Sequence, residues 1–147
     1  IMENINMGRE LSEEAVMEAV LYGRASEFVE EKGGISAQLD IKGANLSGGQ
    51  KQRILIARAL AAKPDILILD DSSSALDYKT DAALRKELRE RFAETTCVII
   101  AQRISSIMNS DHIMVLEDGQ MIGYGTHQEL METCEIYREI GKSQMGI

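Results

Sequence analysis

Apolar residues recur at helical spacing along the first third of the chain. A stripe that includes Val16 follows Ser12, and this arrangement predicts a helix capped by the serine side chain. A second short helix is expected over residues 25–31, where a pair of glycines ends it. Residues 33–46 have weak periodicity and predict an irregular connection. We therefore expect a helical front over residues 1–46.

Two longer helices are predicted further along the chain. Residues 47–63 carry a broad apolar face, and Pro64 prevents that helix from continuing. Residues 78–92 carry apolar side chains at four-residue spacing, with charged residues between them. On this second helix we expect the Asp81–Arg85 pair, four residues apart, to lie on the outer, solvated face.

Two continuous apolar runs interrupt the helical pattern. Residues 66–70 and 96–101 contain branched side chains without polar alternation, which predicts strands buried on both faces. Because a helical segment separates them, the two strands are expected to lie parallel in one sheet, joined by a crossover.

The last third of the chain predicts a hairpin followed by helices. Residues 112–116 and 121–124 flank a Glu-Asp-Gly-Gln turn, which is typical of a hairpin. Thr126 with Glu129 forms a capping box that opens a C-terminal helical segment. The whole pattern predicts an α/β fold, with parallel strands and crossover helices, a helical subdomain, and a C-terminal hairpin and helices.

The composition is compatible with one folded domain. The chain has 147 residues, of which 44% are hydrophobic, and its net charge is −8. No basic stripe is present, so we expect no nucleic-acid partner. No apolar run approaches the roughly 20 residues that span a bilayer. The two cysteines, Cys97 and Cys134, are expected to be reduced thiols without metal-ligand spacing.

Two segments carry candidate chemistry. Ser47, Gly48 and Gly49 open a helix, where unpaired backbone N–H groups and the positive end of the helix dipole attract anions. Asp70 and Asp71 end an apolar strand, and parallel strands deliver such carboxylates to the sheet edge at which α/β proteins bind ligands. The sequence therefore predicts phosphate and metal chemistry.

These segments closely resemble the ABC (ATP-binding cassette) ATPases. The family's order and spacing are present in Leu-Ser-Gly-Gly-Gln at residues 46–50, the apolar run ending in Asp70 and Asp71, and Ser-Ala-Leu-Asp at residues 74–77. Gly-Thr-His at residues 125–127 resembles the closing segment of exporter-type cassettes. The resemblance implies a partial P-loop NTPase-type domain that uses ATP and Mg²⁺.

The resemblance also implies roles for single residues. Asp70 would hold Mg²⁺ through water, since this cation takes few carboxylates and retains several waters. Five further residues would contact nucleotide. Four belong to the pentapeptide, which in this family binds an ATP held by a second nucleotide-binding domain, and one belongs to the loop that crosses the dimer interface. They are Ser47, Gly48, Gly49, Gln50 and Asp77.

Two candidate catalytic positions depart from the family pattern. Asp71 stands where the family usually has glutamate, and its side chain is shorter by one C–C bond, about 1.5 Å. Gln102 stands where a switch histidine is usual, and a neutral amide cannot carry the imidazolium charge. Both departures resemble the degenerate subunit of a heterodimeric exporter. Such a subunit hydrolyses ATP poorly in its own site and supplies its Leu-Ser-Gly-Gly-Gln pentapeptide, the family's signature motif, to its partner's site.

The family's phosphate loop, Gly-x-x-x-x-Gly-Lys-Ser/Thr, does not occur in this sequence. The resemblance therefore implies the C-terminal portion of a nucleotide-binding domain. Residues 1–46 would be the front of its helical subdomain, and residues 47–147 its signature helix, Walker B core and C-terminal segment. The implied partners are a transmembrane domain, at the cytoplasmic face of the cell membrane, and a second nucleotide-binding domain. An incomplete sheet would also favour self-association of this chain.

Two other functions stay open on the sequence alone. One is a non-enzymatic fragment or interaction module that does not bind ATP by itself, because it has no phosphate loop. The other is an ABC ATPase of DNA maintenance, against which stand the absence of long heptad arms and of basic surface.

Overall fold

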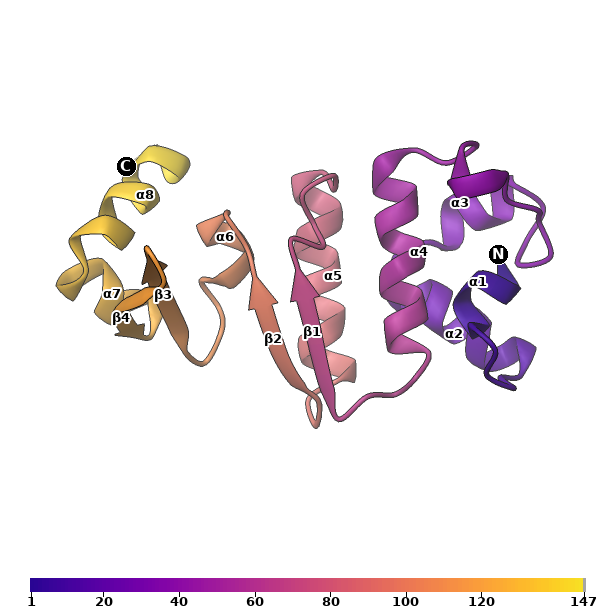
Figure 1. Ribbon diagram of the computed structural model, residues 1–147, viewed down its shortest axis with the longest axis horizontal. Helices are drawn as coiled ribbons and strands as arrows, with labels where there is room; N and C mark the ends of the chain where they lie inside the picture. The colour runs from indigo at the N-terminus through magenta and orange to yellow at the C-terminus, as the bar shows by residue number, and fades with distance from the viewer. Residues whose placement is uncertain (147) are drawn as a thin grey trace. The chain divides into compact units, whose positions relative to one another are not determined.

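The computed structural model describes residues 1–146 and forms two compact units, Ile1–Ile100 and a second unit that begins at Ala101 (Figure 1). The first unit contains α1 (Met2–Asn6), α2 (Glu13–Tyr22), α3 (Ser26–Glu31), the 3₁₀ helix η1 (Ile41–Gly43), α4 (Gly48–Leu60), β1 (Ile66–Asp70), α5 (Tyr78–Arg91) and β2 (Thr96–Ile100). The second contains α6 (Ile104–Ile107), β3 (Ile113–Glu117), β4 (Gln120–Gly125), α7 (His127–Thr133) and α8 (Glu135–Met145). The predicted division into residues 1–46 and 47–147 differs from the division into these two units, and it stays a prediction. Residue 147, the last residue of the second predicted part, lies outside the described residues.

Local capping sets the start of the helices in the first unit. Ser12 caps α2 by accepting a hydrogen bond from the Ala15 amide at 3.3 Å, as predicted. Helix α4 ends at Leu60, three residues before the predicted end. Lys63 has a left-handed backbone with φ 46°, and Pro64 follows it, so the helix cannot extend to this point.

Helix α4 is buried on two sides. Its Ile54 and Ala57 belong to a hydrophobic cluster formed with α1, α2 and α3. Its Ile56 and Leu60 belong to a second cluster, formed with β1 and α5. In Figure 1, α4 accordingly stands between the three N-terminal helices and α5. The helix is therefore the common element of both cores of the first unit.

Two arginines also fasten α4 to the N-terminal helices. The Arg53 guanidinium donates to the Arg24 carbonyl at 2.9 Å and lies 4.7 Å from the centre of the Phe28 ring. Nearer the end of α4, Arg58 Nε donates to the Asn4 carbonyl at 2.6 Å. Polar contacts thus join α4 to the segment before it at two points along its length.

The predicted parallel sheet is confirmed, but its predicted burial on both faces is wrong. Strands β1 and β2 pair in parallel, with Ile68 opposite Val98. Leu67 and Leu69 are buried against α4 and α5, whereas Ile66 and Ile68 are 63% and 64% exposed. In the first unit the helices cover one face of a two-stranded sheet, and the other face is left open. An apolar run looks the same in the sequence whether one or both faces are covered.

The prediction that Asp81 and Arg85 lie on the solvated face of α5 is also wrong. Their side chains are each 7% exposed and form an ion pair at 3.1 Å. The buried stripe of α5 follows positions 81, 84, 85 and 88, so both charges share the face of Leu84 and Leu88. The pair is made as expected, but inside the protein.

The second unit confirms the predicted hairpin and capping box. Strands β3 and β4 are antiparallel, and Thr126 and Glu129 cap α7 reciprocally. Tyr137 of α8 packs with Leu130 of α7 in the core of this unit, and its hydroxyl lies 2.9 Å from His127 Nδ1. Within residues 1–146, no helix combines the length and apolar character that crossing a membrane requires.

Candidate functional site

Residues 47–50 form the glycine-rich helix start of α4. The Ser47 hydroxyl accepts from the Gln50 amide at 3.2 Å, and the Gln50 side-chain oxygen accepts from the Ser47 amide at 3.0 Å. This capping box uses the donor of Gln50, while the first amides of a helix, here those of Gly48 and Gly49, have no carbonyl partner within it. The helix start therefore presents backbone donors and the positive end of the α4 dipole to an anion.

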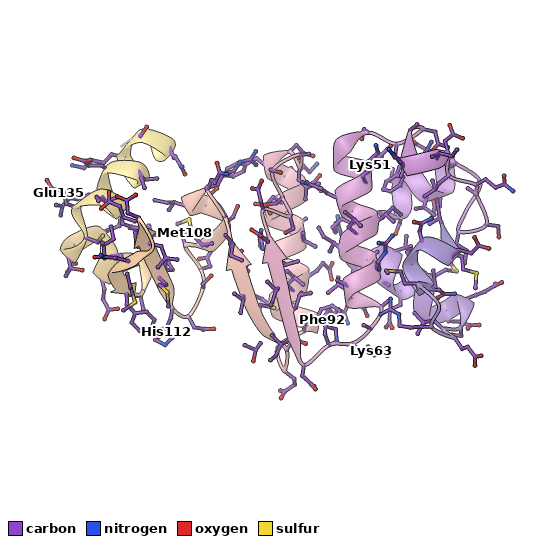
Figure 2. All side chains as sticks on the ribbon, in the orientation of Figure 1. Lys51, Lys63, Phe92, Met108, His112 and Glu135 are labelled. Atoms are coloured by element: carbon purple, nitrogen blue, oxygen red, sulfur yellow. The ribbon has the colours of Figure 1, made fainter. Side chains whose placement is uncertain are left out.

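A hollow of about 400 Å³ lies beside the glycine-rich helix start. It is found at the Lys51 end of α4, whereas Lys63 and Phe92 mark the opposite end of the first unit's helices (Figure 2). Its lining joins the start of α4 to the loop before α5: Ser47, Gly48, Gly49, Arg53, Ala75, Leu76, Asp77 and Thr80. The structure therefore brings four of the predicted nucleotide contacts together.

Gly48 and Gly49 suit an anion, and the close packing of loop 71–77 against them also restricts these positions to small residues. A Cβ atom at Gly49 would lie 2.9 Å from the Ala75 carbonyl oxygen, which is closer than real Cβ contacts. A Cβ at Gly48 would lie 3.4 Å from the Ala75 Cβ, an ordinary contact. The close approach of α4 to loop 71–77 thus demands glycine at one position and favours a small residue at the other.

Asp70 and Asp71 lie at the carboxyl end of β1. Asp70 pairs with Ile100 across the sheet, and Asp71 follows with a left-handed backbone, φ 44°. The Asp71 amide donates to the Ile100 carbonyl at 3.0 Å, and its carbonyl accepts from Ser74 Oγ at 3.1 Å. These bonds hold a conformation that costs a non-glycine residue about 1 kcal/mol or more.

The carboxylates of this turn fit a magnesium ion that is shared with phosphates. Both aspartates are exposed at the strand end. Across residues 1–146 no cluster of three histidine, cysteine or acidic side chains is suited to holding a metal by itself. Mg²⁺ is characteristically held by one or two carboxylates together with substrate phosphates and water, so Asp70 suits this mode and not an all-protein cage.

Asp77 caps α5 and is held in its charged form. Its two carboxylate oxygens accept from the Thr80 hydroxyl at 2.6 Å and from the Thr80 amide at 2.9 Å. These hydrogen bonds lower the pKa of Asp77 below its usual value. Asp77 therefore stays ionised, at the rim of the hollow that also contains Ser47.

Gln52 is a residue of this region that the sequence analysis does not single out. Its side-chain nitrogen donates to Ser74 Oγ at 2.9 Å, and its side-chain oxygen accepts from the Ala75 amide at 3.0 Å. Helical spacing could have identified it, because Gln52 lies four residues after Gly48 and hence on the same face of α4 as the candidate site.

Loop 71–77 is also held from α5. Arg85 Nη2 donates to Ser73 Oγ at 3.2 Å, while the same guanidinium pairs with Asp81. The Asp81–Arg85 pair thus helps to hold loop 71–77 in place. The sequence analysis does not predict this role, because it places both residues on the solvated surface.

Gln102 belongs to the second unit and is described within it. Its side chain is exposed, and its carbonyl accepts from Gln144 Nε2 at 2.7 Å. The same Gln144 side chain accepts from the Ile104 amide at 2.9 Å, so α8 fixes the turn that precedes α6. The predicted catalytic roles of Gln102 and Asp71 stay predictions.

Comparisons with known proteins give consistent matches. A family model described as ABC transporter matches residues 5–74. The ABC transporter ATP-binding protein YfiB of Bacillus subtilis is 45% identical over 148 residues, which is 99% of this chain and 26% of that protein. The ATP-dependent lipid A-core flippase of Francisella tularensis is 39% identical over 146 residues, 97% of this chain and 24% of the flippase.

A solved structure gives the same picture. The structure of a bacterial Atm1-family ABC exporter with ATP bound superposes with a TM-score of 0.92 at 34% identity, covering 97% of this chain and 26% of the exporter chain. The chain thus spans about a quarter of the length of the curated relatives and of this structure.

Proposed function

We propose that this chain, which matches exporter-type ABC transporter nucleotide-binding domains, is the C-terminal portion of such a domain and part of the ATPase of a membrane exporter. The observation that carries the proposal is the hollow shared by Ser47, Gly48, Gly49 and Asp77. Backbone donors at the positive end of the α4 dipole suit a nucleotide phosphate that arrives from another domain.

We place the glycine-rich helix start in the nucleotide site of a second nucleotide-binding domain. There the Ser47 hydroxyl and the amides of Gly48 and Gly49 would contact the γ-phosphate of ATP, with Gln50 keeping the turn in place through its capping box. Asp77, at the start of α5, would lie in the same interface. The open hollow and its unpaired first-turn amides support this arrangement.

This chain's own nucleotide site is the weaker one in our proposal. Asp70 would hold Mg²⁺, which neutralises phosphate charge when bound. Asp71 would orient the attacking water from a side chain about 1.5 Å shorter than glutamate, and a displacement near 1 Å can cost about a hundredfold in rate. Gln102 would donate a hydrogen bond to phosphate without carrying a positive charge.

The partners follow from the same proposal. A second, different nucleotide-binding domain would complete each site, and a transmembrane domain would couple closure of the two domains to export at the cytoplasmic face of the membrane. The names of the relatives support an exporter, since they include a flippase and an Atm1-family exporter. Within this assembly, residues 1–46 would be the front of the helical subdomain and residues 47–147 the signature helix, Walker B core and C-terminal segment.

The proposal is tested by restoring the family residues in the full-length transporter with its partner. The double substitution Asp71→Glu with Gln102→His is made in complexes whose partner domain carries glutamine in place of its own catalytic glutamate. In that background the ATP turnover comes from this chain's site. We expect the turnover rate to rise roughly tenfold to a hundredfold, because the longer carboxylate reaches the water. Steady-state release of phosphate measures it.

A matched control makes the same chemical changes away from the site. Asp118 is an exposed aspartate with a left-handed backbone, φ 50°, and Gln128 is an exposed glutamine on α7. The double substitution Asp118→Glu with Gln128→His is expected to leave turnover unchanged. Equal turnover in the restored and unmodified complexes would contradict the degenerate site.

A further inference from the structure

The side chain of Gln52 joins the glycine-rich helix start, which the proposed function assigns to the partner's nucleotide site, to loop 71–77, whose first residue, Asp71, belongs to this chain's own site. It starts on α4, one turn after the glycine-rich helix start, and ends on loop 71–77, which begins directly after Asp70. We propose that Gln52 is a positioning residue that sets the place of the helix start relative to this loop. The inference rests on the proposed function of both segments.

The first support is the geometry of the amide. Gln52 Nε2 donates to Ser74 Oγ at 2.9 Å and lies 3.5 Å from the Asp71 carbonyl oxygen, and Gln52 Oε1 accepts from the Ala75 amide at 3.0 Å. One half-buried side chain thus uses its donor and its acceptor on the same loop. A carboxamide is suited to this double contact because it carries both kinds of group.

The second support is the packing beside it. Ala75, whose amide Gln52 holds, is also the residue that lies against Gly48 and Gly49. Because the Ala75 carbonyl lies 2.9 Å from where a Gly49 Cβ would be, no side chain fits between the helix start and the loop at this position. A change in the Gln52 contacts therefore shifts Ala75 against the amides that would meet the γ-phosphate.

The third support is that the loop has separate anchors for its remaining parts. Arg85 of α5 donates to Ser73 Oγ at 3.2 Å, and the Asp71 amide donates to Ile100 at 3.0 Å. These contacts tie the loop to α5 and to β2. Gln52 supplies its tie to α4, and hence to Ser47.

The test uses three variants in the full-length transporter with an unmodified partner, so that turnover comes mainly from the partner's site. Gln52→Met keeps the length of the side chain and removes both hydrogen bonds. Gln52→Glu keeps an acceptor for the Ala75 amide and removes the donor to Ser74. The control, Gln128→Met, makes the same change on an exposed helix position.

We expect Gln52→Met to lower kcat roughly tenfold to a hundredfold while the KM for ATP changes less than about threefold, because the helix start is displaced and the bulk of the nucleotide contacts are not. Gln52→Glu is expected to retain an intermediate kcat, and Gln128→Met the full kcat. A merely structural role would instead lower the amount of folded protein, so rates are expressed per folded complex, with Tm measured in parallel.

Two outcomes overturn the inference. Unchanged kcat in Gln52→Met, per folded complex, removes the positioning role. Equal kcat values for Gln52→Glu and Gln52→Met, both well below wild type, overturn the part of the inference that acts through Ala75. Ser47→Arg, which blocks the helix start, separates this from failure of the proposed function. If Ser47→Arg leaves turnover unchanged, the proposed trans site is wrong, and the role of Gln52 fails with it.

Discussion

At the residue scale, two adjacent glycines at the start of α4 have different surroundings. A Cβ at Gly49 meets the Ala75 carbonyl at 2.9 Å, whereas one at Gly48 meets the Ala75 Cβ at 3.4 Å. Phosphate binding alone would require both positions to stay small. The packing therefore predicts that substitutions at Gly48 and Gly49 differ in their effect on stability, even if both glycines contact the same anion.

We predict opposite effects of alanine at these two positions on the free energy of unfolding. Gly49→Ala is expected to destabilise the protein by about 1–3 kcal/mol, because backbone has to move away from the new methyl group. Gly48→Ala is expected to be neutral or to stabilise by up to about 1 kcal/mol, because alanine favours the helix. Thermal unfolding of both variants measures the difference, and equal losses would contradict the assigned contacts.

What the sequence predicts at this scale depends on how far apart the partners lie. Ser12, Ser47 and Thr126 each cap a helix with a residue three positions on, so their roles are legible in short segments. The Gln52 contact joins residues more than twenty positions apart, on a helix and a loop. No local pattern specifies which loop a glutamine will meet.

At the element scale, α5 carries two ion pairs of the same spacing in different environments. Asp81–Arg85 is buried at 3.1 Å, and Lys86–Glu90 is exposed at 3.8 Å. The four-residue spacing predicts the helix and the Asp81–Arg85 pair, but the Lys86–Glu90 pair is not predicted. The spacing does not identify which face is covered, since Asp81 and Arg85 complete the stripe of Leu84 and hence face the core.

Removal of one partner is expected to have unequal costs in these two pairs. Asp81→Ala is predicted to lower the free energy of unfolding by about 3–5 kcal/mol, because it leaves the Arg85 charge buried without compensation. Glu90→Ala is expected to cost less than about 1 kcal/mol. Urea unfolding compares the two.

A double substitution isolates the buried charge as the cause. Asp81→Leu with Arg85→Leu is expected to recover much of the stability that Asp81→Ala loses, since no charge then remains unpaired. Similar small losses in the single variants at Asp81 and Glu90 would contradict the buried pair.

At the scale of the whole molecule, the open face of the β1–β2 sheet is the largest departure from the predicted burial. Ile66 and Ile68 on β1, with Val98 and Ile100 on β2, are between 44% and 64% exposed. The sequence predicts apolar strands correctly, but their coverage is a property of the surrounding elements. An apolar sheet face of this kind is typical of a surface that another segment covers.

We predict that the 147-residue chain, produced alone, self-associates through this sheet. Light scattering after size exclusion is expected to report dimers or larger species whose fraction rises with concentration. Ile68→Thr with Val98→Thr, a cross-strand pair, is expected to reduce that fraction. Ile41→Thr changes an isolated side chain that is 88% exposed and serves as the control. A strictly monomeric profile of the unmodified chain would contradict the prediction.

The two-sided attachment of α4 has a mechanical consequence. Near the C-terminal end of α4, Arg58 is hydrogen-bonded to Asn4. In the middle of the helix, Arg53 contacts Arg24 and Phe28. Ser47 lies at the opposite, N-terminal end. A helix of this length spans about 20 Å, so a rotation of roughly 5° about the Arg58 end carries Ser47 through about 1.7 Å. Since close-packed interiors transmit such displacements, a small tilt of the N-terminal helices is sufficient to take the hydroxyl into or out of reach of a phosphate.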